Sequence, residues 1–224
     1  MKGCKGYVRV YGDELGLVCE FKSSRRFVED AYVTNDCTSL AAVTLGQENG
    51  VFVSNVVLYD LTKAGEAELM ANYDVKDGLV AVIGQQGDRL VTVSDTCLTY
   101  AGTDGKVSAT YPYSGLYLRG YALEGDGFAA LLLNRYSSGS VGRLVTVGTD
   151  GTELASLDVN REVLDISAAG RYLAVLYTDS LVIYNQDLQV YASLNGTDFA
   201  TGVLLRTDGS ALLLSSEHAA LFLP

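Results

Sequence analysis

The chain has 224 residues, of which 48% are hydrophobic and 19% are charged, and its formal net charge is −11 at pH 7. This composition excludes an intrinsically disordered chain, and the acidic balance argues against a nucleic-acid or anionic-membrane partner, because both need a cationic surface. A chain of this length buries enough of its surface to fold without disulfides or metal ions.

The first residues do not resemble a signal peptide. Residues 1–14 mix charged side chains with scattered apolar ones and contain no continuous hydrophobic segment. The longest apolar runs, 79–83 and 128–133, are far shorter than the ~20 residues that a helix needs to cross a bilayer. As written, the chain is expected to be soluble and to make no direct membrane contact.

Short apolar runs alternate with turns rich in Gly, Asp and Asn along the whole chain, which is typical of β-hairpins. Two strands are predicted first, at 7–11 and 17–21. Four units of four strands each follow, at about 27–70, 75–111, 116–158 and 162–194. Three more strands are predicted at 202–206, 211–214 and 219–223. The segment 65–71 has a helical composition, but its place in this order predicts a strand, so no helix is expected.

A recurring, mostly aromatic position ends the third strand of each unit. The six positions lie 37 to 48 residues apart, and they are Tyr11, Tyr59, Tyr100, Val147, Tyr184 and Phe222. An average period of about 42 residues falls in the range of a four-stranded propeller blade. The sequence therefore predicts an all-β fold, a β-propeller-type array of four-stranded antiparallel blades, as a single domain over residues 1–224. A β-sandwich is the alternative, but it would not require a repeat.

The strands at the two ends leave two arrangements open. The N-terminus supplies the last two strands of a blade and the C-terminus supplies the first three. They could combine into a fifth, split blade and close a ring, which would remove exposed sheet edges. Alternatively, the chain is the C-terminal fragment of a longer propeller.

The four cysteines show no CxxC spacing, which argues against a zinc site or a redox motif. They are Cys4, Cys19, Cys37 and Cys97. We expect them to be reduced and to act mostly as small apolar residues, and their spacing leaves the compartment open.

Several stretches go beyond a generic propeller. They are 7–21 (YVRVYGDELGLVCEF), 40–50 (LAAVTLGQENG), 126–133 (DGFAALLL), 163–175 (VLDISAAGRYLAV), and the ending 208–224 with DGSALLLSS and LFLP. Together they resemble the C-terminal part of a bacterial family, domain of unknown function 5711. The resemblance covers nearly the whole chain. It implies a membrane-anchored protein with a short cytoplasmic N-terminus, one helix and a propeller on the extracytoplasmic side. It also implies that the first blades and the anchor lie outside this chain, and it carries over no catalytic residues.

The sequence offers little chemistry. The single histidine, His218, lies at a turn near the C-terminus, and no nucleophile motif such as GxSxG occurs. The Asp-Gly segments at 102–105 and 124–127 offer too few carboxylates for a calcium loop and are interpreted as hairpin turns. Asp165 and Arg206 fall on innermost strands and could line a channel, or they could be structural. No cofactor and no metal site are expected.

Loop lengths favour one face for binding. The loops 46–55 and 134–143 join second and third strands, and they share a face with the blade connections 22–26 and 112–117. Long loops on a rigid scaffold are where binding residues concentrate, and Tyr and Arg are enriched at interface hot spots. The candidate partner-binding residues on this face are Arg25, Arg26, Phe52, Tyr113, Tyr117, Arg135, Tyr136 and Arg143.

The sequence thus favours a non-enzymatic interaction or scaffold module that binds a protein partner. By family resemblance, it would be the exported part of a membrane-anchored bacterial envelope protein. A carbohydrate-active or other small-ligand-processing propeller enzyme is the alternative. Inward-facing carboxylates around the channel would favour the enzyme, whereas Ser, Thr and apolar groups there would favour the interaction module.

Overall fold

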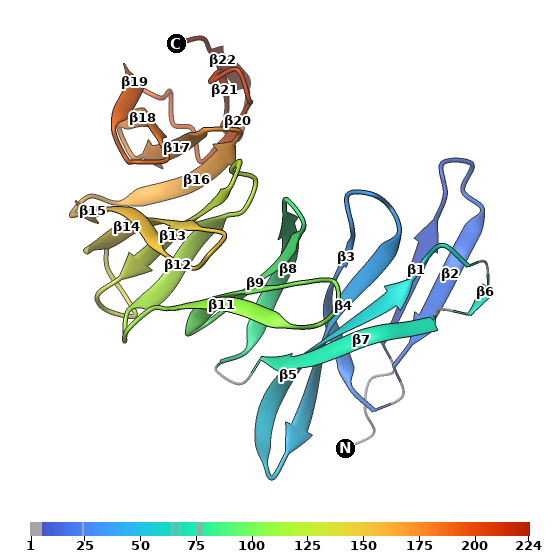
Figure 1. The fold of residues 1–224 in the computed structure, drawn as a ribbon. Helices are drawn as coiled ribbons and strands as arrows, with labels where there is room; N and C mark the ends of the chain where they lie inside the picture. Colours follow the sequence, from blue (N-terminus) through green and yellow to red (C-terminus); the bar gives the residue numbers. More distant parts are fainter. Residues whose placement is uncertain (1–5, 24, 64, 67, 76–77) are drawn as a thin grey trace. The chain divides into compact units, whose positions relative to one another are not determined.

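The computed structural model describes residues 6–23, 25–63, 65–66, 68–75 and 78–224. These residues form β-strands joined by turns (Figure 1), as the sequence predicts. None of the described segments forms a helix long and apolar enough to cross a membrane. The chain divides into two compact units, Met1–Thr110 and Tyr111–Pro224. The single domain over residues 1–224 stays a prediction.

The first unit contains two four-stranded antiparallel sheets and a smaller one. The first four-stranded sheet has the order β3-β4-β5-β7, with strands Phe27–Val33, Ser39–Glu48, Val51–Asp60 and Glu68–Val75. The second runs β8-β9-β10-β11, with strands Val80–Gln86, Arg89–Ser94, Cys97–Ala101 and Val107–Pro112. In the smaller sheet, β2 (Leu17–Lys22) lies between β1 (Tyr7–Tyr11) and the short β6 (Gly65–Glu66).

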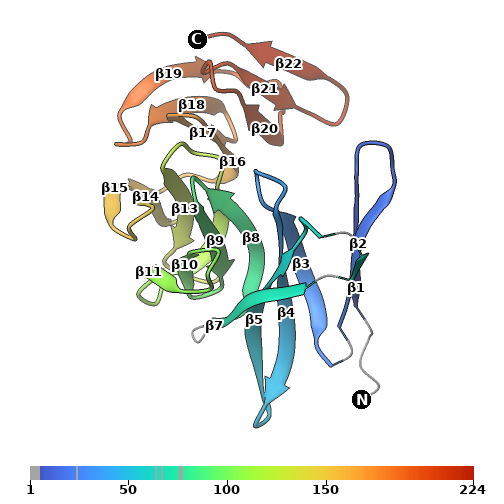
Figure 2. The ribbon, with the colours of Figure 1, turned by 45° about the vertical axis from the view of Figure 1, so that its right-hand side comes forward.

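The second unit repeats the same architecture. One sheet has the order β12-β13-β14-β15, with strands Tyr117–Ala122, Phe128–Asn134, Gly142–Gly148 and Glu153–Val159. The next runs β16-β17-β18-β19, with strands Val163–Ala169, Tyr172–Tyr177, Ser180–Asn185 and Val190–Asn195. A three-stranded sheet of β20 (Gly202–Leu205), β21 (Ala211–Leu214) and β22 (Ala219–Phe222) ends the chain (Figure 2).

Four complete four-stranded blades are therefore confirmed close to their predicted bounds. Residues 68–75 are the strand β7, so the strand prediction for the helix-like segment is confirmed where the structure describes it. The combination of the two end groups into a split fifth blade stays a prediction.

Most of the middle strands are buried on both faces, which explains their continuous apolar runs, whereas β5 alternates between buried and more exposed residues. In β13 every residue of FAALLLN is buried, and in β17 every residue of YLAVLY is buried. The fourth strands β15 and β19 alternate between exposed and half-buried residues along most of their length. A blade with such middle strands presents two apolar faces and must be covered on both sides.

Within each unit, consecutive sheets supply that cover to each other. In the second unit, Leu132 and Leu144 of one blade pack with Leu173 and Val175 of the next in one core cluster. A second cluster joins the β16–β19 sheet to the terminal sheet through residues such as Leu181 and Leu213. The first unit has equivalent clusters between its own sheets. This blade-on-blade packing is how a β-propeller array builds its core.

A β-bulge recurs near the start of the first strand of every complete blade. The pairing register skips one residue in β3, β8, β12 and β16, at Glu29, Ala81, Arg119 and Leu164. A bulge leaves one residue unpaired and bends the strand, and it can re-aim a side chain. Because these four residues share no chemistry, the bulge is a property of the repeat and does not depend on a particular side chain.

The residue after the bulge links two blades where it is aspartate. Asp165 Oδ2 accepts a hydrogen bond from the backbone N–H of Val203 in the next blade at 2.9 Å, and Oδ1 accepts one from Ile166 N at 2.9 Å. Asp30 does the same in the first unit, accepting from Ile83 N at 2.9 Å and from Ala31 N at 2.8 Å. These bonds favour the structural interpretation of Asp165.

Two predictions from the sequence are wrong: the loop at 46–55, and the place of Arg206 on an innermost strand. The predicted loop 46–55 is a continuation of the β4–β5 hairpin, in which Gly46 pairs with Val53 and Gln47 with Phe52. Its turn is the two-residue Asn49-Gly50, both with positive φ, which is the turn that suits the twist of a hairpin. Arg206 lies just beyond the end of β20, where its backbone N–H closes a turn with Ser210 O.

Candidate functional site

The loop between β13 and β14 is held firmly at its base. Buried Asn134 donates a side-chain hydrogen bond to Gly139 O at 2.6 Å, and Arg135 N donates to Val141 O at 2.9 Å. Above this base the side chain of Tyr136 is 62% exposed. Tyr117, at the start of β12, pairs in register with Asn134 and is also exposed. Tyr117, Arg135 and Tyr136 therefore gather at one end of the β12–β15 blade, as the loop analysis predicts.

Arg143 belongs to a different part of the same blade. Its guanidinium contacts Glu153 Oε1 at 3.0 Å and Ser156 Oγ at 2.5 Å. In the strand register, Ser156 lies opposite Val145, which is farther from the loop than Arg143 itself. The guanidinium is thus directed along the sheet, away from the loop, and is engaged within the protein.

Glu153 is the centre of this polar network. It also accepts a hydrogen bond from the Tyr111 hydroxyl at 2.6 Å. The hydrogen bond from Tyr111 is the largest of the effects that lower the pKa of Glu153, followed by those of Ser156 and Arg143. Burial and the adjacent carboxylate raise the pKa of Tyr111 to about 12. Tyr111, Arg143 and Ser156 therefore stabilise the Glu153 carboxylate.

The prediction that Tyr113 is presented to a partner is wrong. Its side chain is only 1% exposed. Ser114 and Gly115 both adopt positive φ, and Leu116 N donates to Tyr113 O at 3.0 Å, which closes a tight turn. That turn places the ring of Tyr113 inside the protein, and a loop position in the sequence gave no sign of it.

Three of the candidate residues lie in the first unit. Arg25 is exposed, and Phe52, at 60% exposure, lies close to the tip of the β4–β5 hairpin. Arg26 forms an ion pair with Glu48 at 2.7 Å, and its guanidinium lies over Gly46, where an added Cβ would meet it at 3.0 Å. That all the candidate residues share one face stays a prediction, because they are divided between the two units.

A polar cavity of about 260 Å³ lies beside the β13–β14 loop in the second unit. It is lined by residues of β12, of this loop and of the connection from β15 to β16, among them Arg119, Asn134, Ser140, Arg161, Glu162 and Val163. A second cavity of about 270 Å³ shares Arg119 and Val163 with it. In this blade both cavities include residues on the side of the second-to-third-strand loop and the blade connection, and that this side binds a partner stays a prediction.

Sequence reasoning missed the charged residues of this cavity. Arg119 occupies the bulge of β12, and a bulge is a matter of register that composition does not reveal. Arg161 lies in a blade connection, Asn160 to Glu162, that is too short to attract attention. The residue types could have been noticed, because an Arg-Glu pair follows directly after the fourth strand.

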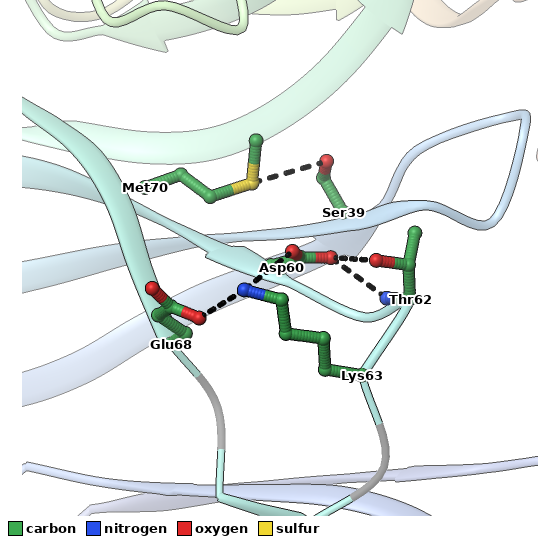
Figure 3. A network of polar contacts seen from close by, with 6 residues as sticks. All are labelled: Ser39, Asp60, Thr62, Lys63, Glu68 and Met70. Atoms are coloured by element: carbon green, nitrogen blue, oxygen red, sulfur yellow. Dashed lines mark hydrogen bonds and ion pairs between the residues drawn. The ribbon is translucent and has the colours of Figure 1, made fainter.

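A more voluminous cavity, about 1070 Å³, lies in the first unit, on the side of the third-to-fourth-strand turns. It is lined by residues of the β1–β2 turn and of β2, and by Tyr59, Leu61 and Thr62. Asp60 holds the part of the lining that contains Leu61 and Thr62, because its carboxylate accepts hydrogen bonds from Thr62 N and Oγ1 at 2.8 and 2.6 Å (Figure 3). Lys63 joins Asp60 to Glu68 across the same turn (Figure 3).

The single histidine does not form a catalytic arrangement among the residues that the structure describes. His218 is exposed at the turn between β21 and β22, and its Nδ1 lies 3.2 Å from Ser215 Oγ. That hydroxyl already accepts hydrogen bonds from Glu217 N and His218 N, so it closes the turn. Within the described ranges, no group of three or more His, Cys, Asp or Glu side chains is placed to hold a metal ion.

The described cysteines behave mainly as the sequence predicts. Cys19 and Cys97 are buried in strands, and burial raises the pKa of the Cys19 thiol. Cys19 pairs in register with Val10. Cys37 is an exposed thiol in a turn. Cys4 lies outside the described residues.

No family model and no curated protein matches the chain. Solved structures do. The C-terminal WD40 domain of Sif2 has a TM-score of 0.58 at 16% identity, over 98% of this chain and 76% of that chain. BBS1N in complex with ARL6DN has a TM-score of 0.64 at 15% identity, over 98% and 72%. The Dos1 propeller has a TM-score of 0.62 at 12% identity, over 96% and 62%.

At these identities the likeness establishes the fold alone. Together with the repeated four-stranded antiparallel sheets, it defines the class of the protein: the chain is an all-β, β-propeller-type array.

Proposed function

We propose that the chain is a non-enzymatic interaction module whose partner binds at the β13–β14 end of the β12–β15 blade. The observation that carries this proposal is the contrast between the loop and its base. Asn134 and Arg135 fix the base by hydrogen bonds at 2.6 and 2.9 Å, while the ring of Tyr136 remains largely exposed. A rigid, exposed aromatic side chain loses little conformational entropy on binding, which is why such residues anchor interfaces.

The comparisons support an interaction role only by analogy. BBS1N, one of the similar structures, is described in complex with ARL6DN. Fold does not imply function, so the analogy raises the expectation without identifying a partner. The resemblance to domain of unknown function 5711 supports a further proposal, in which the module is the extracytoplasmic part of a membrane-anchored bacterial envelope protein.

No specific observation favours the enzymatic alternative. Two first-strand carboxylates that such a site could use, Asp30 and Asp165, each accept a backbone hydrogen bond from the next blade. A carboxylate engaged in this way holds the blades together and is poorly placed to act as an acid or base.

Site-specific photo-crosslinking tests the proposal. A photoreactive phenylalanine analogue replaces Tyr136, and in a matched control it replaces Tyr11, which is 51% exposed in the other unit. In the cell envelope of the source organism, position 136 should give one defined crosslinked protein that position 11 does not give. The purified partner should then bind the chain in vitro and lose affinity for Tyr117→Ala/Tyr136→Ala. Equal crosslinking at both positions, or unchanged affinity of that variant, would contradict the proposal.

A further inference from the structure

The cavity beside the β13–β14 loop carries two arginine side chains in different states. Arg161 is fixed: its Cζ lies 3.8 Å from the centre of the Tyr177 ring, and Nη1 lies 3.6 Å from Asp179 Oδ1 and 3.4 Å from Ser180 Oγ. A guanidinium stacked on an aromatic ring keeps its edge available for further hydrogen bonds. Arg161 therefore forms a pre-oriented wall of the cavity.

Arg119 is the second cation and is unengaged. Within the described part of the chain, its side chain makes no hydrogen bond and no ion pair, although it lines both cavities of this region. The repeat does not require an arginine here, since the equivalent bulge positions are Glu29, Ala81 and Leu164. The bulge explains the backbone at residue 119 but leaves the guanidinium without a structural role.

The remaining lining limits what this cavity can hold. Leu132, Val159 and Val163 supply an apolar surface, and Glu162 supplies one negative charge against the two arginines. Asp179 already pairs with Arg161 and Glu162 lines the cavity, so of the two arginines only Arg119 lacks an acidic partner among the described residues, which suits a single carboxylate better than a doubly charged phosphate. The volume of about 260 Å³ lies below the ~300–1,000 Å³ of pockets that take drug-sized ligands, so it suits one side chain or chain end.

We propose that the Arg119–Arg161 cavity binds one carboxylate group of a partner chain, with its aliphatic stem against Val163. The planar fork of a single guanidinium matches a carboxylate bidentately, and both Arg119 and Arg161 line this cavity. The proposal rests on the proposed interaction function, because Gly139 and Ser140 of this cavity belong to the loop that presents Tyr136, and Asn134 holds the base of that loop. A carboxylate anchored here would fix the register of the partner beside the aromatic contact.

The local charge also fits the charge of the whole chain. With a net charge of −11, the protein repels acidic partners at long range. A partner that is neutral or basic overall would not be repelled at long range, and its single carboxylate could still bind in the cavity. The two sources of such a group are an Asp or Glu side chain and a C-terminus.

The test uses the purified chain labelled with ¹⁵N and three peptides of one length. The first has an internal Glu and an amidated C-terminus, the second has Gln in its place and a free C-terminal carboxylate, and the third has Gln and an amide. The Nε–Hε signals of Arg119 and Arg161 are followed by NMR. We expect saturable shifts with the first or the second peptide, which identifies the source, and none with the third. Binding should weaken as salt is added.

Three variants sharpen the result. Arg119→Gln should raise the dissociation constant of the responding peptide about tenfold or more, because a charge-assisted hydrogen bond is lost. Arg119→Lys keeps the charge but not the planar guanidinium fork, so its dissociation constant should lie between those of the wild-type chain and Arg119→Gln. Lys106→Gln makes the same charge change at an exposed turn in the other unit and should have no effect. A retained, dispersed NMR spectrum shows that each variant is folded.

The possible results distinguish the carboxylate site from the proposed interaction function of the Tyr136 loop. Absence of saturable shifts with both carboxylate peptides, equal binding of the third peptide, or an unchanged constant for Arg119→Gln would each overturn the carboxylate site. Crosslinking at position 136 could persist in any of these cases. Conversely, carboxylate binding without a crosslinked partner would leave the cavity intact and contradict the role of the Tyr136 loop.

Discussion

The aspartate after the β16 bulge gives a sharp stability test. In Asp165→Ala two hydrogen bonds are lost, from Val203 N and from Ile166 N, both 2.9 Å long. Val203 is only 6% exposed, so its backbone N–H would be left without a partner in a region with little access to water. The carboxylate thus joins β16 to β20 at a point where no backbone pairing does so.

The magnitude follows from these two bonds. A hydrogen bond to a charged group contributes about 1.5–3 kcal/mol, and an orphaned buried donor costs a further ~1–3 kcal/mol. Because Asp165 is only partly buried, part of this is recovered by water, and we expect Asp165→Ala to lower the free energy of unfolding by about 2–4 kcal/mol. Asp165→Asn keeps one acceptor oxygen and should cost about half as much.

Two measurements check this prediction. Denaturant unfolding is followed by far-UV circular dichroism, with Asp158→Ala as a control that removes the same charge from an exposed position in the same unit. Since repeat arrays can unfold in steps, native-state hydrogen exchange supplies the local measurement. Exchange should accelerate at Val203 N, whereas Leu205 N, which donates to Ser167 Oγ at 3.0 Å, should be less affected. A loss below about 0.5 kcal/mol, with unchanged protection of Val203 N, would refute the reasoning.

Two further predictions concern the β12–β15 blade. A Cβ added at Gly142 would lie 2.3 Å from Leu133 O, so Gly142→Ala should destabilise the blade by about 2 kcal/mol or more and broaden the NMR signals of the adjacent loop, and a wild-type melting curve would contradict this. The lowered pKa of Glu153 means that its stabilising effect is present above the usual pKa of a glutamate and is lost as the pH falls through the lower folded-state value. Glu153→Gln should therefore flatten the pH dependence of unfolding below about pH 4.5, and an unchanged profile would contradict it.

Much of the fold could be predicted because its signals are local. A buried strand such as Phe128–Asn134 must be apolar throughout, and the tight turns between strands need residues that tolerate positive φ, such as Gly151 and Gly209. These two signals recur every 37 to 48 residues, so the blades could be counted from the sequence. Asn49-Gly50 carries the same turn signal, so a hairpin turn and not the long loop 46–55 should have been predicted there.

The candidate site was harder to predict because its features depend on register and on long-range contact. Nothing near Tyr113 in the sequence distinguishes a buried ring from an exposed one, since the turn after it decides the outcome. Arg143 has a residue type that is enriched at interfaces and was predicted to end the loop 134–143, but it lies in β14, and Glu153 and Ser156 direct its guanidinium along the sheet.

Arg119 is the opposite case, a residue of the proposed site that sequence reasoning did not select. Its place on a first strand gave no reason to single it out, and only the skipped pairing between Leu118 and Gly120 reveals that it is a bulge residue. The bulge is common to all four blades, yet in this blade alone the extra position carries a cation. A repeat that supplies the same backbone irregularity in each blade can thus vary one side chain without disturbing the fold. The proposed carboxylate site therefore rests on a difference among equivalent positions and not on a motif of adjacent residues.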